Sequence, residues 1–473
     1  MTRPEAVPSA EGSRGQGPSR VADLLHRRPV LLLAFAFAVM ADPVSSVAYA
    51  VEAALRALHG DLGLLVPTMA LVLCIIALVI VNYQQLVTRY PTGGGASAAA
   101  GEAFGDGWAF IPIGALVVDF VLTIAISVSA GASAVIAYFP ALAHWRLLLA
   151  LLLVVVVAGI TWFGHLGRLF FALMTLAFIA VAGAVLVFGA TAAPHPTGTI
   201  TSAPGQTSAV AVALAFPVAM ALATGVEAPS SAIAQLGQLD DEGRRQFGRV
   251  TLWLTLGIVG TITLGLALEA HRLRIGVPHA DTTQIAELAR AAAPGPLFAA
   301  FQLVTALLLL SAASSSFQAG PGLLKALARR SAPDGGQTGI LPVSVGRTNV
   351  HHTPVWGVVL FTLVSAAVVA AAGGRDQELV LFYAVSVFLS FLAGLLAMAR
   401  FARQDKRTGH LVLNAVGAAV VAFTLVVNLA RGLPLVSLAA ALIVAAALHR
   451  TWVRAGRPGG VRDLASQAEA TGQ

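Results

Sequence analysis

Residues 41–49 read Ala-Asp-Pro-Val-Ser-Ser-Val-Ala-Tyr and interrupt the first long apolar run of the chain. A carboxylate at the centre of a membrane helix costs about 2.5–3.5 kcal/mol on insertion scales. Pro43 also removes a backbone donor and clashes with the preceding turn. Because irregular backbone at that depth cannot face lipid, we expect residues 41–49 to line a cavity inside the protein.

A second interruption lies far downstream, at residues 223–231, which read Ala-Thr-Gly-Val-Glu-Ala-Pro-Ser-Ser. It repeats the chemistry of the first: an acid, a proline and two adjacent serines. Two similarly interrupted helices in corresponding halves of a chain are typical of transporters built from inverted repeats. We therefore organise the rest of the sequence around these two breaks.

The composition indicates a polytopic helical membrane protein. Of 473 residues, 57% are hydrophobic and only 11% are charged. The single cysteine, Cys74, leaves no disulfide framework and no thiolate metal site. We count twelve apolar segments long enough to span a membrane. Their approximate ranges are 30–57, 63–87, 108–138, 145–163, 168–190, 209–237, 248–270, 296–328, 355–373, 377–400, 409–429 and 433–449.

The basic residues predict the orientation of the chain. With the N-terminus inside, most of the 29 Lys and Arg residues fall in cytoplasmic segments, so we expect both termini in the cytoplasm and the helices in the cell membrane. Membrane orientation thus accounts for the excess of positive charge, and we expect no nucleic-acid partner. Residues 281–293 could form a short amphipathic helix on the external side. The expected divisions are a disordered tail at 1–29, a first repeat at 30–190, a second repeat at 209–402, two further helices at 409–449 and a cytoplasmic tail at 450–473.

The third apolar segment carries a column of oxygen atoms. Asp119, Thr123 and Ser127 recur every four residues, so their side chains stack on one helix face. The two hydroxyls alone would be interpreted as small residues that pack helices together. With the carboxylate on the same stripe, the pattern favours a binding site.

Other polar residues fall inside the apolar segments. Tyr49 could present its phenolic oxygen to the same cavity as Asp42, or belong to an interfacial aromatic belt. The sequence likewise allows two roles for Tyr383, a gate residue or a residue of the interfacial aromatic belt. Glu227 lies three residues after Thr224, and few intramembrane bases are present to pair with it. Two further acids, Glu52 and Glu269, lie nearer helix ends and are expected to be solvated or structural.

Asp42, Asp119 and Glu227 together predict an electronegative cavity. Without buried Lys or Arg, it must be neutralised by protons or by a bound cation. Oxygen-only ligands suit a hard cation. An amino-acid carboxylate would instead need bare helix N-termini that present backbone donors, and Asp42 stands where that carboxylate would dock. No nucleophile–base set is visible, so we expect neither an enzyme nor a cofactor.

These residues resemble the amino acid–polyamine–organocation (APC) superfamily, and within it the KUP-type potassium–proton symporters of the bacterial KimA-like branch. The resemblance rests on four stretches: 42–52, the 119/123/127 column, Thr-Gly-Val-Glu-Ala at 224–228, and Phe-Tyr-Ala-Val-Ser-Val-Phe-Leu-Ser-Phe at 382–391. It implies a leucine-transporter-like fold: a five-plus-five inverted repeat with broken helices 1 and 6, followed by two extra helices. It also implies proton coupling. The potassium sites that it implies are at Asp42, Asp119, Thr123, Ser127 and Thr224.

The sequence departs from that branch in three places. Pro43 stands where a small residue is expected and is reminiscent of divalent-metal transporters, although the Met-Pro-His of their helix 6 is absent here. Helix 8 carries Ser-Ser-Phe-Gln-Ala-Gly-Pro-Gly at 315–322, where the branch tends to have Asp-x-Pro-Arg. The large cytosolic C-terminal domain of the branch is missing, so we expect no control by a cyclic dinucleotide, and dimerisation through that domain is put in doubt.

The sequence therefore predicts an all-α polytopic transporter for proton-coupled import of a monovalent cation, with potassium as the favoured ion. The expected partners are potassium, a proton, the lipid bilayer and a second copy in a homodimer. The alternative is a proton-coupled amino-acid or polyamine permease of the same superfamily. The predicted cation-binding residues are Asp42, Tyr49, Asp119, Thr123, Ser127, Thr224 and Glu227, with Glu227 as the proton carrier and Tyr383 as a gate candidate.

Overall fold

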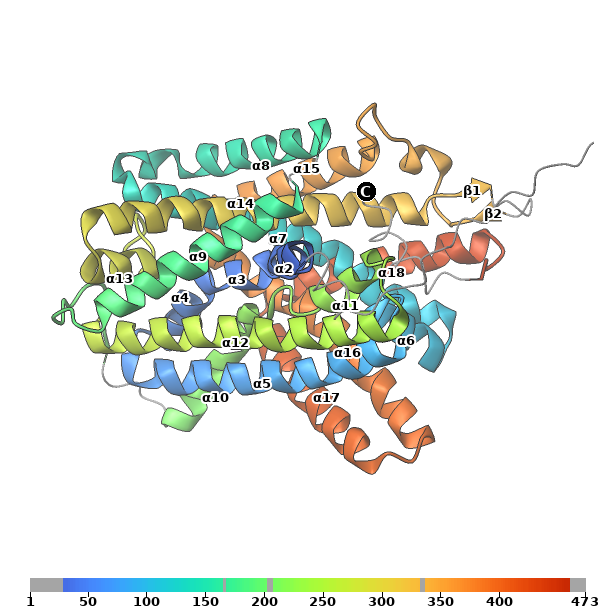
Figure 1. Cartoon of the computed structure of the whole chain (residues 1–473), viewed down its shortest axis with the longest axis horizontal. Coiled ribbons are helices and arrows are strands. Elements are labelled where there is room, and N and C mark those ends of the chain that lie inside the picture. Colours follow the sequence, from blue (N-terminus) through green and yellow to red (C-terminus); the bar gives the residue numbers. More distant parts are fainter. Residues whose placement is uncertain (1–28, 165–166, 202–206, 332–336, 460–473) are drawn as a thin grey trace, which may run out of the picture.

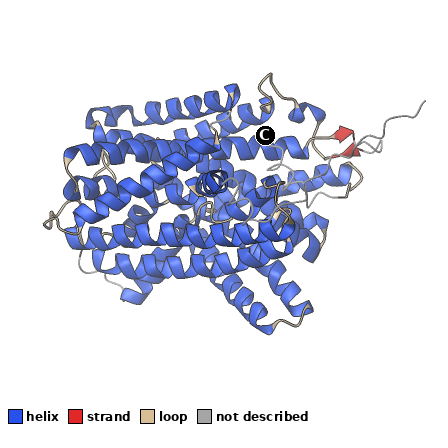
Figure 2. Cartoon of the chain, in the orientation of Figure 1, coloured by secondary structure: helices blue, strands red, loops and turns tan. Residues whose placement is uncertain are grey.

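The computed structural model describes residues 29–164, 167–201, 207–331 and 337–459. Residues 1–28 of the predicted disordered tail (1–29) and residues 460–473 of the predicted C-terminal tail lie outside the described residues, and the last residue of the first range, Pro29, begins a helix. Helices make up nearly all of the described chain (Figure 2), and the strands are two short segments, β1 (Arg330–Ser331) and β2 (Gln337–Thr338), paired antiparallel. The predicted all-α class is confirmed.

Ten helical spans of the described chain are long and apolar enough to cross a membrane. Together with the apolar helix α15 (Val355–Ala371) and the interrupted first helix, they account for the twelve predicted segments. The spans are α5 (Leu62–Arg89), α7 (Phe110–Tyr138), α8 (Arg146–Phe163), α9 (Arg168–Gly189), the interrupted run Ser208–Gln235, α12 (Asp241–Leu273), α14 (Gly295–Leu327), α16 (Asp376–Gln404), α17 (Thr408–Leu429) and α18 (Leu435–Arg454).

The first helix is interrupted but does not unwind at Pro43, where we expected it to. It consists of α2 (Pro29–Val39), α3 (Ala41–Ser45) and α4 (Val47–Ala57), separated by single residues that keep helical dihedral angles. Pro43 falls in the first turn of α3, where backbone N–H groups have no intrahelical partner in any case. The proline therefore sits in the segment without opening the backbone.

The sixth span is fully unwound at its centre. It runs from α10 (Ser208–Ala219) through a 3₁₀ turn (Met220–Ala223) to α11 (Ala228–Ala232) and a last 3₁₀ turn (Ile233–Gln235). Residues 224–227 between them form turns, and Gly225 has φ +68°, a left-handed conformation that favours glycine. The two interrupted helices stand five spans apart in the chain, as the inverted repeat predicts; the symmetry of the two halves stays a prediction.

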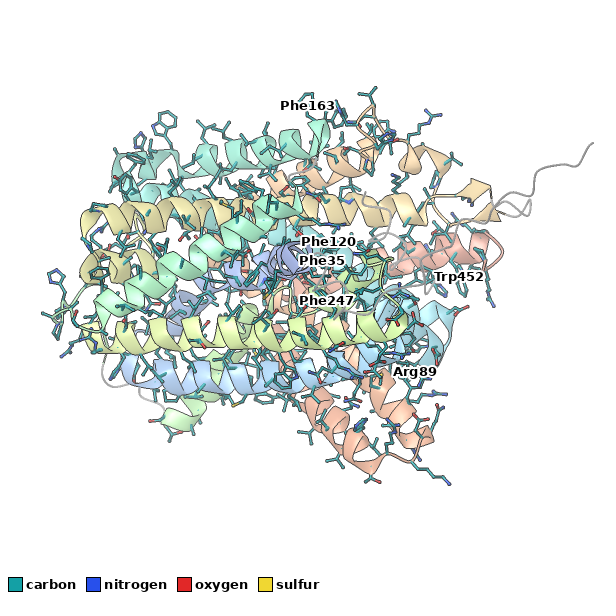
Figure 3. All side chains as sticks on the ribbon, in the orientation of Figure 1. Phe35, Arg89, Phe120, Phe163, Phe247 and Trp452 are labelled. Atoms are coloured by element: carbon teal, nitrogen blue, oxygen red, sulfur yellow. The ribbon has the colours of Figure 1, made fainter. Side chains whose placement is uncertain are left out.

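α7 is the central helix of the molecule, packed against α8, α14, α15, α16 and α18. A side chain at Gly114 would lie 2.5 Å from the Ala441 carbonyl oxygen, so the glycine permits the close approach of α18. One turn earlier, the ring centroid of Phe110 lies 5.7 Å from that of Trp452, which Figure 3 labels. The helix that carries the predicted oxygen column is therefore enclosed by protein.

The long helices α5, α12 and α14 run along the longest dimension of the molecule (Figure 1). The amphipathic helix predicted at 281–293 is present as α13 (Gln284–Ala292), capped by the Thr283 hydroxyl. It marks one end of the molecule, the α13 end. At the opposite end lies α6 (Gly95–Phe104), a short helix that we had not predicted, so we name that end the α6 end.

One helix boundary and one contact between helices were not predicted from the sequence. α12 begins at Asp241, two turns before the predicted 248, because Asp240 accepts a hydrogen bond from the Gly243 backbone nitrogen (2.8 Å) and caps the helix. At the far side of the molecule, α17 is fastened to α5 by buried amides. Asn82 donates to Asn414 Oδ1 (2.9 Å), and Asn414 donates to Gln85 Oε1 (2.9 Å).

Candidate cation site

The two breaks meet inside the molecule. A Cβ atom on Gly225 would lie 2.7 Å from Asp42 Oδ2 and 2.9 Å from Pro43 Cδ, so the Asp42 carboxylate rests directly on the unwound backbone. Ser46 donates a hydrogen bond across the same contact to the Leu222 carbonyl oxygen (3.1 Å). Only glycine fits at position 225, because its φ and the adjacent carboxylate both exclude a side chain.

Tyr49 and Thr224 join the breaks through a chain of hydroxyls. Tyr49, only 2% exposed, donates to Thr224 Oγ1 (3.3 Å), and Thr224 donates in turn to the Ala221 carbonyl oxygen (2.6 Å). The burial and the partner place Tyr49 in the interior of the protein and not in an interfacial belt. Its role as a cation ligand stays a prediction.

The oxygen column of α7 faces this junction from the other side. Asp119, Thr123 and Ser127 are all buried. The hydroxyl of Tyr383, on α16, lies 3.5 Å from Thr123 Oγ1 and within hydrogen-bonding reach of the Asp119 carboxyl group. Tyr383 therefore links α16 to the column, in a position that a belt residue would not occupy. Ser127 shares the helix face of the column but makes no described hydrogen bond to the other predicted residues.

Glu227 lies at the end of the unwound segment and faces the α6 end. It lines a narrow cavity of about 30 Å³ together with Tyr83, Ser390 and Ser230, large enough for a water molecule. A Cβ atom on Gly95, the first residue of α6, would be only 3.5 Å from Ser230 Oγ, so the cavity ends against the start of that helix. The position gives Glu227 a short polar route toward the α6 end.

The three predicted acids share an unusual feature. One oxygen of each is buried and makes no hydrogen bond within the described part of the chain: Asp42 Oδ1, Asp119 Oδ1 and Glu227 Oε2. A buried carboxylate oxygen without a partner carries a desolvation cost that a cation or a proton would relieve. The described residues contain no cluster of three or more His, Cys, Asp or Glu side chains arranged around one metal position. Any cation bound here would therefore combine carboxylates with hydroxyl and carbonyl oxygens.

Two other buried acids, nearer the α13 end, are fully partnered. Glu52 pairs with Arg56 (2.8 Å) and accepts from the Gln284 backbone nitrogen (2.9 Å). Asp376, at the start of α16, accepts from Ser133 (2.7 Å) and from Gln377 (2.9 Å). These acids hold the α13 end together and leave no oxygen free for a ligand.

Gln377 lies between a cavity near the α13 end and the first interrupted helix. Its side-chain nitrogen lies 3.4 Å from the main-chain oxygen of Tyr49. On its other side it lines a cavity of about 850 Å³ with Ala53, Val218 and Leu381. Gln377 is therefore in contact with the first interrupted helix and also forms part of the cavity wall.

Glu269 is packed inside the protein, which fits the structural alternative of its prediction and not the solvated one. It is 7% exposed, and its carboxylate occupies the space where a side chain on Gly189 would lie.

Sequence reasoning missed several residues around the junction. Tyr83 lines the Glu227 cavity and Ser386 reaches Asp119, yet neither was given a role. The polar run Asn-Tyr-Gln-Gln at 82–85 within an apolar helix was a signal for the first. For Ser386, position on the same helix face as Tyr383 was the available signal.

Comparison with known proteins places the chain in a family. A family model described as amino acid permease matches residues 31–452, which run from the first turn of α2 to the last turn of α18 and include both breaks. The chain belongs to the amino acid permease family. The resemblance to the APC superfamily is thereby confirmed.

This amino acid permease family member is also similar to the potassium transporter KimA of Bacillus subtilis (strain 168), with 29% identity over 399 residues. The alignment covers 80% of this chain and 63% of the relative. The chain thus spans less than two thirds of the length of that curated relative. The likeness agrees with the KimA-like branch indicated by the sequence.

Proposed function

We propose that this chain is a secondary active transporter that imports a monovalent cation, potassium in the first place, together with a proton. The observation that carries the proposal is the set of unpartnered carboxylate oxygens where the two breaks meet. They are accompanied by the hydroxyls of Tyr49, Thr224 and Thr123. This set offers a hard cation only oxygen atoms.

The breaks supply the conditions that a transported ion needs. The cation must shed its water and find replacement oxygens in a region closed to lipid. Asp42 and Asp119 approach that region from different helices, so their charges favour a cation held between them. The similarity to a protein named as a potassium transporter supports potassium as the ion.

The proton is assigned to Glu227. It lines the cavity toward the α6 end, whereas neither Asp42 nor Asp119 is among the described residues that line it. Carboxylates that interact at short range do not all ionise together, so one of the three is expected to hold a proton when no cation is bound. The carboxylate with access to water is the one that can exchange it.

The second candidate is a proton-coupled amino-acid or polyamine permease. The description of the family model favours it. The position of Asp42 argues against an amino-acid substrate. Its carboxylate lies against the backbone at Gly225, where the carboxylate of an amino acid would need hydrogen-bond donors. A polyamine carries no carboxylate and would tolerate Asp42.

The proposal includes a setting for the protein. Lys and Arg residues are in excess near the α6 end. This excess favours an orientation in which the α6 end and both termini lie on the cytoplasmic side of the cell membrane. A homodimer is also proposed as the working form.

The deciding experiment is competitive uptake in a host that lacks its own potassium transporters. Expression of the chain should restore growth at low potassium, and rubidium should compete with potassium for uptake while alanine does not. Inhibition by alanine would move the assignment to an amino-acid permease, and inhibition by putrescine alone would move it to a polyamine permease. Failure of all three to affect uptake would refute this site as the substrate site.

A further inference from the structure

A second cavity, of about 410 Å³, opens at the α6 end, far from the two breaks. It lies between the ends of α5 and α16 and the starts of α12 and α17. Three arginines line it, Arg89, Arg249 and Arg407, each from a different segment, and His410 lies beside them. The one acidic side chain among its described lining residues is Asp405.

Two of the three guanidinium groups, those of Arg89 and Arg249, are held by neighbouring side chains. Arg89 pairs with Glu102 (2.5 Å) and lies 3.8 Å from the centre of the Phe401 ring. Arg249 donates to the Thr88 hydroxyl (2.9 Å), which is a neutral partner. Figure 3 shows Arg89 at the end of α5, above the hairpin of α16 and α17.

Two of the three positive charges have no acidic partner in the described structure. The ion pairs among the described residues include neither Arg249 nor Arg407. A guanidinium stays charged at any physiological pH and presents a fork of donors that matches phosphate oxygens. Orientation in the membrane accounts for arginines at helix ends, but it does not require them to converge on one cavity from separate helices.

The surroundings indicate a ligand that reaches the cavity from the membrane. Trp253 lies one turn after Arg249 on the same face of α12 and is 46% exposed. On the same helix, the exposed Val250 and Leu254 add an apolar surface beside Arg249. A basic cavity next to an exposed tryptophan and apolar side chains has the features of a membrane–water interface.

We propose that this cavity binds the phosphate of an anionic phospholipid. Arg249 and Arg407 would hold the phosphate oxygens, with Arg89 and the Gln85 side chain at the wall, and the acyl chains would follow the apolar surfaces beside Trp253. The site is separate from the junction of the breaks, so the proposal does not depend on the identity of the transported substrate. Free phosphate has the same chemistry as the lipid headgroup, and the experiment below distinguishes the two ligands.

Lipid retention measures the site directly. The full chain, purified in neutral detergent, is mixed with equal amounts of phosphatidylglycerol and phosphatidylcholine, and the retained lipids are identified by native mass spectrometry. Wild type should retain phosphatidylglycerol in preference. The double variant Arg249→Gln/Arg407→Gln should lose this preference by about 30-fold, the effect of two basic residues near a membrane surface.

A matched control removes equal charge from the same end of the molecule. Arg450 and Arg454 are exposed residues of α18 that do not line the cavity, and Arg450→Gln/Arg454→Gln should retain phosphatidylglycerol as wild type does. If the first double variant fails to fold, as judged by its thermal unfolding, the wild type alone still tests the proposal. Added salt should then displace phosphatidylglycerol and leave phosphatidylcholine unchanged.

Three results would overturn the assignment. Equal retention of both lipids by wild type would remove the basis for an anionic site. Equal loss in the α18 control would show a general effect of surface charge. Saturable binding of inorganic phosphate to wild type, absent in the cavity variant and unaccompanied by lipid preference, would assign the cavity to a free anion.

Discussion

Asp42 combines a fixed position with an unused charge. One oxygen rests on Gly225 and the other has no described partner, so the side chain is held without being neutralised. Asparagine has nearly the same shape and no charge. Replacing Asp42 by asparagine therefore tests the effect of its charge while the shape of the side chain stays nearly the same.

The Asp42→Asn variant should bind the cation about 10- to 100-fold more weakly, the loss expected for a hydrogen bond or contact to a charged group. The concentration dependence of rubidium uptake into proteoliposomes measures this as an increase in KM. Glu242→Gln serves as the control, because Glu242 is a surface acid of α12 paired with Arg245. An unchanged KM for Asp42→Asn would contradict a charged ligand at this position.

Asp119 and Glu227 should separate binding from coupling. Asp119→Asn removes a charge from the buried column and should abolish cation binding, measured by calorimetry on the purified protein. Glu227→Gln should keep binding but lose the movement of protons, because its cavity toward the α6 end makes it the carrier. Acidification of the lumen by Glu227→Gln proteoliposomes during rubidium entry would show that another carboxylate carries the proton.

Gly225 provides the backbone surface against which the Asp42 carboxylate lies. Gly225→Ala places a residue at φ +68°, which costs about 1–2 kcal/mol, and sets its methyl group against Asp42. We expect a lower thermal unfolding temperature and loss of cation binding. Gly237→Ala is the matched control, since nothing lies within 4 Å of a side chain there. Wild-type binding by Gly225→Ala would show that Asp42 can move without consequence.

Among the helices, the α13 end is tied together at the start of α16. Asp376 accepts from Ser133 of α7, Arg146 of α8 donates to the same hydroxyl (2.6 Å), and Gln377 reaches the Tyr49 carbonyl oxygen of α4. Four helices thus meet through one short polar chain.

Gln377→Ala should loosen α4 without unfolding the protein. Amide hydrogen exchange in residues 47–57 should become faster, since the link from α16 to the Tyr49 carbonyl group is lost. Gln404→Ala, at the exposed far end of the same helix, should leave exchange in 47–57 unchanged. Equal exchange in both variants would show that the Gln377 contact does not restrain α4.

The helices were predictable where hydrophobicity alone determines them. The apolar runs at 63–87, 108–138 and 409–429 reappear within a few residues as α5, α7 and α17. The start of α12 was missed because its first turns are charged and are held by a capping side chain, a local contact that hydropathy does not record. α6 was missed because its ten residues, which begin at the third of three glycines and are mostly Gly, Ala and Ser, give no periodic apolar signal.

The site was predictable to a similar depth. Asp42, Asp119 and Glu227 could be identified because they are carboxylates inside apolar segments, where a buried charge is costly. Contacts between distant segments could not be identified in this way. The seating of Asp42 on Gly225 and the Gln377 contact depend on how the helices pack, and that packing is a property of the folded chain.

For the whole molecule, the proposed transport has an energetic consequence. A monovalent cation that moves inward gains about 2.3 kcal/mol per 100 mV of inside-negative potential, and a proton moving with it about doubles that gain. A symporter should therefore respond to a pH gradient when the membrane potential is held at zero.

Proteoliposomes with clamped potential provide the measurement. An acidic exterior should drive rubidium into the vesicles against its own gradient in wild type, and the effect should vanish in Glu227→Gln. If a pH gradient has no effect on wild type, the chain is a uniporter.

The buried amides between α5 and α17 bear on any attempt to reduce this protein to a ten-helix version. Asn82 and Gln85 belong to the part that forms the predicted first repeat, yet their partner Asn414 lies beyond both repeats. Truncation after α16 would turn these side chains toward acyl chains, where each unsatisfied polar group costs several kcal/mol. A minimal transporter would need apolar replacements at positions 82 and 85 before it could do without its last two helices.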